Sequence, residues 1–416
     1  MKLNKVSQIA LVAAIGLAAA TLLSGCIIVN IDYVFVADSA TNTPGSAGQI
    51  ETFLTDAESG ALRPGPPIVS SGGSDPVSMV VASDYTDLYV ANKGNNSVVH
   101  FAIDLTSGVL TQKDSITTSA PPDYIALSVA HNYLYVVSGT TTATLTEYSL
   151  GSSGAIGSEV AQESLVVPGY AGDTVVPTGV AVIPNSLGLT VSPSVYAVYA
   201  TVYDQSAYNP GGTVTSSANP GWIFGFAVDP SSGALTATAD SPYLAGVKPT
   251  AVTADPTDRF VYATDFASNE LIGYSIQSGG QLSFMINGPF KTGNEPTAVV
   301  VDPRGIFIYV ANSLQSTVSA YNIALSTGTP SATVAVTGSS TNSTDTDPVA
   351  ILVDPALGRF VFTANRLGDT VSGFRLNPST GVLTATENTP YVVSGSSPAA
   401  IAAVPKGNHA SEAVTP

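Results

Sequence analysis

Residues 296–312 read PTAVVVDPRGIFIYVAN, and nearly the same phrase begins at Pro249 as PTAVTADPTDRFVYATD and at Pro348 as PVAILVDPALGRFVFTAN. Each copy has an apolar first strand, a turn, and a second strand rich in aromatic and β-branched residues. Similarity that recurs along one chain is the sequence signature of a repeat architecture, so it decides the fold before any other feature. The repeated unit is therefore built on an antiparallel strand pair.

Further copies extend the array to both ends of the chain. They begin at Pro76 (PVSMVVASDYTDLYVAN), at Pro122 (PDYIALSVAHNYLYVVS) and at Pro177 (PTGVAVIPN, continued after an insertion by VYAVYATVYD). A seventh copy is split, because the second-strand phrase DYVFVAD stands at 32–38 and the first-strand phrase PAAIAAVPKG starts only at Pro398. Each half lacks a partner unless the two ends meet, so we expect the ring to close by pairing the N- and C-terminal strands.

A third and a weaker fourth strand follow each pair. Third strands alternate, as in STVSAYNIA (316–324) and DTVSGFRLN (369–377), and fourth strands follow turns such as STG in STGVLTATEN (379–388). Four antiparallel strands at a spacing of about 45 to 55 residues are typical of a propeller blade. The sequence thus predicts an all-β, seven-bladed β-propeller over residues 31–405 and a flexible tail over 406–416.

Composition agrees with short strands and many turns. Of 416 residues, 44% are hydrophobic and 10% charged, with 38 Gly and 28 Pro. The formal net charge of −17 repels phosphate backbones, so nucleic acid is excluded as a partner, and cations or basic partners are favoured.

The N-terminus predicts export. Residues 1–25 combine basic Lys2 and Lys5 with an apolar run and small residues before the only cysteine, Cys26, which is typical of a signal peptide. The ending LSGC resembles the lipobox of bacterial lipoproteins, which implies diacylation of Cys26 and a tether over residues 26–30. We expect an exported lipoprotein that is anchored in a membrane, either at the outer membrane and periplasm or at the cell surface. Ile27, which follows the cysteine, gives slight support for outward sorting. The alternative is an ordinary secretory signal.

The repeated phrase, the TVSxY third strands and the SxGxLT endings resemble the lactonase-type seven-bladed propellers, which include 6-phosphogluconolactonase-like enzymes and YVTN-repeat surface proteins. The resemblance covers about residues 31–405 and implies the propeller fold. It also implies that catalytic members carry Arg, His and Glu around the central channel, with an Arg-His pair just after the proline of one first strand. No such position here holds His or Arg.

Three residues remain as weak catalytic candidates. A lactonase needs a base to activate water and a cation to hold the oxygen that becomes negative. Glu295 or Asp347 could supply the base and Arg366 the cation, because all three lie where first strands begin or second strands end. The three histidines are expected to pack or to be solvated.

Acidic residues recur at the same end of the ring. The predicted set comprises Asp38, Asp75, Asp123, Asp204, Asp265, Glu295 and Asp347. Oxygen-rich rings suit hard cations, so Ca²⁺ or a cationic ligand is one expectation. The alternative is that Asp and Asn end strands because their side chains satisfy the backbone of turns.

The insertion between 204 and 221 is rich in turn formers, and Tyr208 within it is the best candidate for contact with a partner. The sequence therefore predicts first a cell-envelope binding module that uses an acidic mouth and this loop, with a protein, a glycan or a small molecule as ligand. The alternative is a lactonase-type hydrolase or cycloisomerase acting on a sugar lactone.

Overall fold

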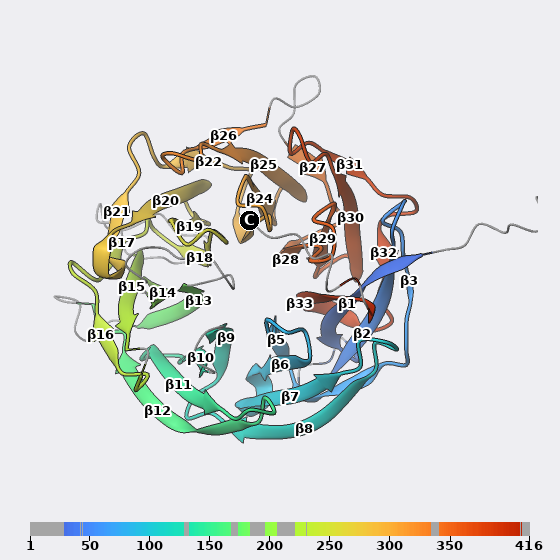
Figure 1. The fold of residues 1–416 in the computed structure, drawn as a ribbon, viewed down its shortest axis with the longest axis horizontal. Coiled ribbons are helices and arrows are strands. Elements are labelled where there is room, and N and C mark those ends of the chain that lie inside the picture. The colour runs from blue at the N-terminus through green and yellow to red at the C-terminus, as the bar shows by residue number, and fades with distance from the viewer. Residues whose placement is uncertain are drawn as a thin grey trace, which may run out of the picture.

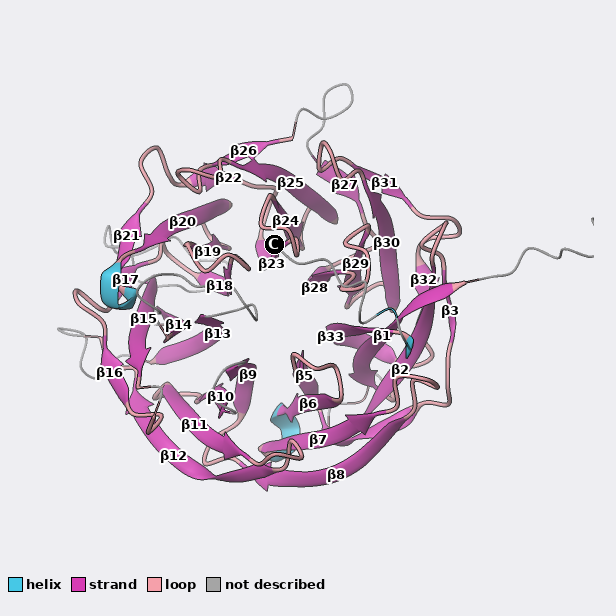
Figure 2. Ribbon diagram, viewed as in Figure 1, coloured by secondary structure: helices cyan, strands magenta, loops and turns pink. Residues whose placement is uncertain are grey.

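A computed structural model describes residues 29–41, 43, 45–128, 133–167, 174–183, 196–205, 221–229, 231–333, 341–407 and 409. Seven antiparallel sheets stand around a central axis, as Figure 1 shows. Strands dominate these ranges (Figure 2), and the short 3₁₀ turns include η1 (Lys93–Asn95) and η2 (Ser278–Gly280). The predicted all-β, seven-bladed propeller is confirmed.

The blades are numbered here from the one that contains the N-terminal strand. Blade 1 holds β33 (Ser396–Pro405), β1 (Asn30–Ser39), β2 (Ala47–Asp56), β3 (Leu62–Pro64) and β4 (Val69–Ser74). Blade 2 holds β5 (Pro76–Val81), β6 (Asp87–Asn92), β7 (Ser97–Ile103) and β8 (Leu110–Thr117). Blade 3 holds β9 (Pro122–Ser128), β10 (Tyr133–Ser138), β11 (Thr144–Leu150) and β12 (Ile156–Ser164). Blade 4 holds β13 (Val175–Ile183), β14 (Ala197–Asp204), β15 (Gly221–Val228), β16 (Leu235–Ala237) and β17 (Tyr243–Leu244).

The other three blades carry the clearest copies of the repeat. Blade 5 holds β18 (Pro249–Ala254), β19 (Phe260–Asp265), β20 (Glu270–Ile276), β21 (Leu282–Phe284) and β22 (Phe290–Lys291). Blade 6 holds β23 (Pro296–Val301), β24 (Phe307–Asn312), β25 (Thr317–Ile323), β26 (Pro330–Ala332) and β27 (Thr341–Ser343). Blade 7 holds β28 (Pro348–Val353), β29 (Phe360–Asn365), β30 (Thr370–Leu376), β31 (Leu383–Ala385) and β32 (Tyr391–Val392). In five blades the fourth position is thus split into two short strands that pair with the same third strand.

The ring closes through the two ends of the chain. Strand β33 forms the inner strand of blade 1 and pairs antiparallel with β1, with Asp32 opposite Pro405 and Ala37 opposite Ala400. In Figure 1 the blue β1 and the red β33 lie together. The predicted pairing of the chain ends is confirmed, and it gives β1 a partner on the side that β2 leaves open.

The hydrophobic core lies between neighbouring blades. Phe307 and Tyr309 of β24 pack with Val353, Phe374 and Leu376 of blade 7, and the other interfaces are built in the same way. Because each blade buries its face against the next one, no single blade has a complete core.

The turn that follows each first strand and begins with Asp-Pro in the three quoted copies joins blades at the end opposite the strand-leading prolines. Asp302 Oδ1 accepts the backbone N–H groups of Ile306 and Phe307, both at 2.8 Å, and so fixes the turn before β24. Arg304 donates from Nε to Asp302 at 2.6 Å and from Nη2 to the carbonyl of Gly358 in blade 7 at 3.1 Å.

Arg259 of blade 5 also reaches the next blade, but at a different place, because its Nη1 donates to the carbonyl of Leu325 after the third strand of blade 6 at 2.6 Å. Arg259, Arg304 and Arg359 each lie in the turn before a second strand, where the sequence predicts that they face water. Arg359 is exposed, whereas Arg259 and Arg304 are partly buried and reach across to the next blade.

The second-strand tyrosine and the SxG turn form another contact between blades. The hydroxyl of Tyr309 donates to the carbonyl of Gly381 in blade 7 at 3.0 Å. Equivalent bonds join Tyr89 to Gly154 at 2.5 Å, Tyr199 to Gly280 at 2.7 Å and Tyr262 to Gly328 at 2.6 Å. Gly381 has a φ of 71°, and a Cβ there would overlap the ring of Phe307. We call this the Tyr–Gly contact, and it explains both motifs.

Several predicted segments lie outside the described residues. They include residues 1–25, Cys26, His131, Tyr208 and most of the 204–221 loop. No helix in the described part of the chain is long and apolar enough to span a bilayer.

Candidate functional site

We define the mouth as the end of the ring where inner strands begin at the prolines and second strands end. Blades 5, 6 and 7 follow one another around the ring and each brings charged residues there. Lys248 precedes β18, Glu295 precedes β23, Asp347 precedes β28 and Arg366 follows β29. The three predicted catalytic candidates therefore lie in two adjacent blades.

Arg366 is held by its own blade. Its Nε donates to Asp347 Oδ2 at 2.9 Å, and its backbone N–H donates to the Asp347 carbonyl at 2.8 Å. The Asp347 side chain is 10% exposed and that of Arg366 is 52% exposed. Since Asp347 already accepts from Arg366, it acts as a positioning residue for the guanidinium rather than as a free base.

The charge of Arg366 reaches Tyr124 of β9 on another side of the ring. Burial raises the pKa of the Tyr124 phenol to about 12, and the Asp123 carboxylate adds to the rise, whereas the Arg366 guanidinium opposes it.

Lys248 and Glu295 are the charged residues that blades 5 and 6 bring to the mouth. The Lys248 Nζ lies 4.2 Å from the centre of the Phe266 ring and 5.5 Å from that of Tyr203. Burial lowers the pKa of Lys248, and the nearby Glu295 carboxylate opposes that shift. The backbone N–H of Glu295 donates to Asn269 Oδ1 at 2.7 Å, at a φ of 55°.

A second charged pair lies in blades 2 and 3. Lys93, which directly follows β6, donates from Nζ to Asp123 Oδ1 at 2.5 Å. Lys93 and Lys248 are mouth residues that sequence reasoning missed, although each directly adjoins a predicted strand end. Asp123, Glu295 and Asp347 thus each have a cation nearby, so the mouth carries mixed charge in place of the predicted acidic ring.

The predicted acids at second-strand ends do not line the mouth. Asp38, Asp204 and Asp265 are 0%, 3% and 0% exposed. Asp265 accepts the backbone N–H groups of Val247 and Lys248, both at 2.9 Å. This is the alternative expected for strand-terminating acids, which satisfy the backbone of turns. Asp75 is exposed beside the mouth.

Asp38 is unusual among these acids. Burial raises its pKa to about 7, and the carboxylates of Glu51 and Asp369 add to the rise, while a hydrogen bond from Gln49 opposes it. Near neutral pH this carboxyl therefore holds its proton for a large part of the time.

The Ca²⁺ expectation for the mouth stays a prediction. Within the described ranges, no group of three or more His, Cys, Asp or Glu side chains is arranged to hold a metal ion. The carboxylates that the cations engage are also poor ligands for a further cation.

The positions just after the prolines tie neighbouring blades together. Thr250 Oγ1 donates to the carbonyl of Pro296 at 2.7 Å, and Thr297 Oγ1 donates to that of Pro348 at 2.6 Å. These are positions where the resemblance leads one to look for His and Arg. Their role here is structural.

His100 lies inside blade 2 and away from the mouth. Its Nε2 lies 2.7 Å from Asp87 and its Nδ1 lies 2.9 Å from Asp114, and the ring stacks on Tyr89 with centroids 4.9 Å apart. The side chain is 1% exposed. The prediction that His100 packs is consistent with these contacts.

Seven blades with this repeat and this ring closure define a lactonase-type propeller. The family model described as "Lactonase, 7-bladed beta-propeller" matches residues 36–169, 210–349 and 246–410, and the chain belongs to that family. A comparison with curated proteins finds no match.

Solved structures share the fold at low sequence identity. The periplasmic gluconolactonase PpgL of Pseudomonas aeruginosa is 20% identical, with a TM-score of 0.69 over 91% of this chain and 100% of that one. A candidate 6-phosphogluconolactonase of Bacteroides uniformis is 17% identical, with a TM-score of 0.69 over 90% of this chain and 100% of that one. A protein of Lactobacillus plantarum is 16% identical, with a TM-score of 0.66 over 90% of this chain and 100% of that one.

Proposed function

We propose that the protein is a lactone hydrolase whose reaction takes place at the mouth, between blades 5, 6 and 7. The observation that carries this proposal is the presence of Glu295, Lys248 and Arg366 in three consecutive blades of a lactonase-family propeller. Family membership favours this reading over the binding module that the sequence alone puts first.

Each residue has a distinct task in this proposal. Glu295 accepts a proton from water while the water oxygen attacks the lactone carbonyl carbon. Arg366, oriented by Asp347, and Lys248 stabilise the negative charge that develops on the carbonyl oxygen. The ring C–O bond then breaks, and the leaving alkoxide takes a proton back to give a hydroxy acid.

Burial of Lys248 supports an electrostatic role. Partial burial removes some of the water around the Lys248 ammonium and thereby lowers its pKa. A poorly hydrated charge interacts more strongly with a developing oxyanion than a fully solvated one does. The aromatic rings of Phe266 and Tyr203 hold it in place.

We propose in addition that the protein acts outside the cytoplasm on a sugar lactone, anchored through acylated Cys26. The support is the signal-like stretch of residues 1–25, together with the structural similarity to a periplasmic gluconolactonase.

Assays with a panel of sugar lactones test the hydrolase. We expect turnover, and we expect Glu295→Gln, Lys248→Met and Arg366→Ala each to lower kcat/KM by about 10²-fold or more. Three matched control variants make the same charge changes at exposed residues outside the mouth: Glu159→Gln, Lys113→Met and Arg375→Ala. These controls should retain full activity.

A binding module is the second candidate, because Thr250 and Thr297 tie blades together at positions where catalytic groups were sought. Absence of turnover across the panel, or turnover that all three mouth variants retain, would refute the hydrolase. That result would leave the binding role.

A further inference from the structure

A cleft of about 600 Å³ opens between blades 4 and 5, and its Asp265 end adjoins Lys248, whose backbone N–H donates to Asp265. One wall comes from residues 240–246, which include β17, and the other from β20 and β21. The volume is in the range of small-molecule sites in proteins.

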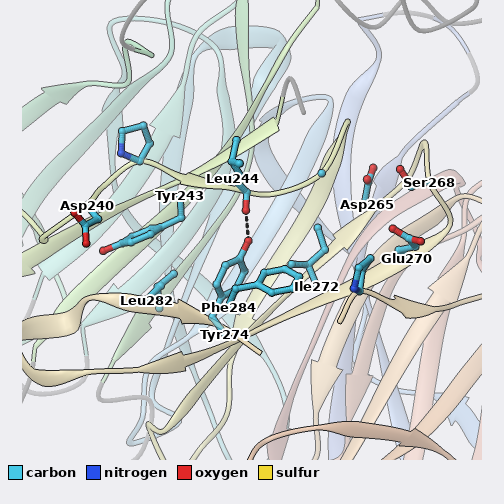
Figure 3. Close-up of a pocket in the computed structure, with 13 residues that line it drawn as sticks. Asp240, Tyr243, Leu244, Asp265, Ser268, Glu270, Ile272, Tyr274, Leu282 and Phe284 are labelled. Atoms are coloured by element: carbon cyan, nitrogen blue, oxygen red, sulfur yellow. Dashed lines mark hydrogen bonds between the residues drawn. The ribbon is translucent and has the colours of Figure 1, made fainter. Parts of the chain in front are cut away.

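The middle of the cleft is apolar. Figure 3 shows the side chains of Leu244, Tyr274, Ile272 and Phe284 between its two ends. Leu244 and Phe284 are 56% and 49% exposed, so their apolar surface is available to a ligand. The Tyr274 hydroxyl is occupied, because it donates to the carbonyl of Leu244. The walls are therefore suited to a hydrocarbon chain.

The two ends of the cleft are acidic. Figure 3 places Asp240 at one end and Asp265, Ser268 and Glu270 at the other. None of the thirteen lining residues is Lys, Arg or His. Negative groups beside apolar walls focus a negative potential, which favours a cationic ligand.

The present partners of Asp240 and Glu270 are exchangeable, whereas Asp265 is buried and held by the backbone N–H groups of Val247 and Lys248. Glu270 Oε1 binds the ammonium of Lys291 at 2.7 Å, but the Lys291 side chain is 78% exposed. Asp240, which is exposed, accepts from the side-chain amide of Gln281 at 2.5 Å. Exposed pairs of this kind contribute little stability, so a competing ammonium can replace them at low cost.

We propose that this cleft binds a linear aliphatic polyamine. One ammonium lies at Asp240, another lies at Glu270 in place of that of Lys291, and the methylene chain packs along Leu244 and Phe284. The Phe284 ring adds attraction for a nearby ammonium. A sugar would place hydroxyl groups against the apolar middle without hydrogen-bond partners.

Isothermal titration calorimetry with spermidine tests the proposal. We expect one binding site per chain, with affinity weakened about 3- to 10-fold in Asp240→Asn and in Glu270→Gln. Phe284→Ala should weaken binding as well. Glu159→Gln removes the same charge from an exposed site on β12 of blade 3 and should bind like the native protein.

Two further ligands define the chemistry. 1,8-Octanediol, which has the apolar chain without the charges, should bind far more weakly than spermidine. The proposal is overturned if spermidine shows no saturable binding, or if Glu159→Gln weakens binding as much as Asp240→Asn does, because only the net charge of −17 would then attract it. Spermidine binding should survive in Glu295→Gln, which separates this site from the mouth.

Discussion

Replacing Tyr309 by Phe should destabilise the ring measurably. The Tyr309 side chain is 0% exposed, and its hydroxyl supplies a hydrogen to the Gly381 carbonyl in the next blade at 3.0 Å. Removing the hydroxyl leaves that buried carbonyl without this donor, which costs about 1 to 3 kcal/mol. With about 2.1 cal/mol/K per residue over about 375 residues, the unfolding entropy is about 0.8 kcal/mol/K, so Tm should fall by about 1 to 4 °C.

Thermal melts by circular dichroism measure this shift, and two further variants check its cause. Tyr262→Phe removes the equivalent bond to Gly328 and should lower Tm by a similar amount. Phe362 occupies the matching position in blade 7, so Phe362→Tyr offers a hydroxyl to the next SxG-like turn and should not lower Tm. Unchanged melting of both Tyr→Phe variants would refute the view that the Tyr–Gly contact stabilises the ring.

Three other predictions follow from particular residues. Gly381→Ala should lower the free energy of unfolding more than Gly279→Ala does, as measured by urea unfolding. Both glycines have φ near 70°, a conformation that costs a non-glycine residue about 1 to 2 kcal/mol, but only at Gly381 would the added Cβ meet an aromatic ring. Asp38 keeps its proton in the folded state between its ordinary pKa of 3.8 and its raised pKa of about 7, so its contribution to stability falls as pH rises through that window. Asp38→Asn should therefore raise Tm relative to the native protein more at pH 8 than at pH 4; an equal effect at both would contradict the shift. Cys26→Ser should abolish labelling of cells by radioactive palmitate, and labelling that persists would exclude this anchor.

The fold could be predicted because each blade repeats the same pattern of strands and turns. The split seventh copy, DYVFVAD at one end and PAAIAAVPKG at the other, also predicts how the ring closes, and the register of Asp32 opposite Pro405 confirms it. What repetition could not reveal is which side chains cross from one blade to the next. From the sequence, Arg304 has the features of a solvated turn residue, but in the structure its guanidinium donates to the Gly358 carbonyl of the next blade.

The candidate site was harder to predict, since a residue at a strand end can point either into the mouth or into its own blade. Asp265 and Asp347 looked equivalent in sequence, yet Asp265 turns inward to accept backbone N–H groups and Asp347 holds Arg366. The repeated acids do not point to Lys93 and Lys248, because neither lysine recurs from blade to blade. The signal each carries in the sequence is its place directly beside a predicted strand end.

Closure by β33 has a consequence for how the chain acquires its structure. The segment that completes blade 1 is synthesised after the other six blades, whereas its partner β1 is synthesised before them, and hundreds of residues separate the two. Contacts between such distant segments form slowly, because a long loop must be ordered before they stabilise it. A nascent chain that has made six blades still exposes β1 as an unpaired edge, so a truncation before Ser396 should leave a product prone to aggregation.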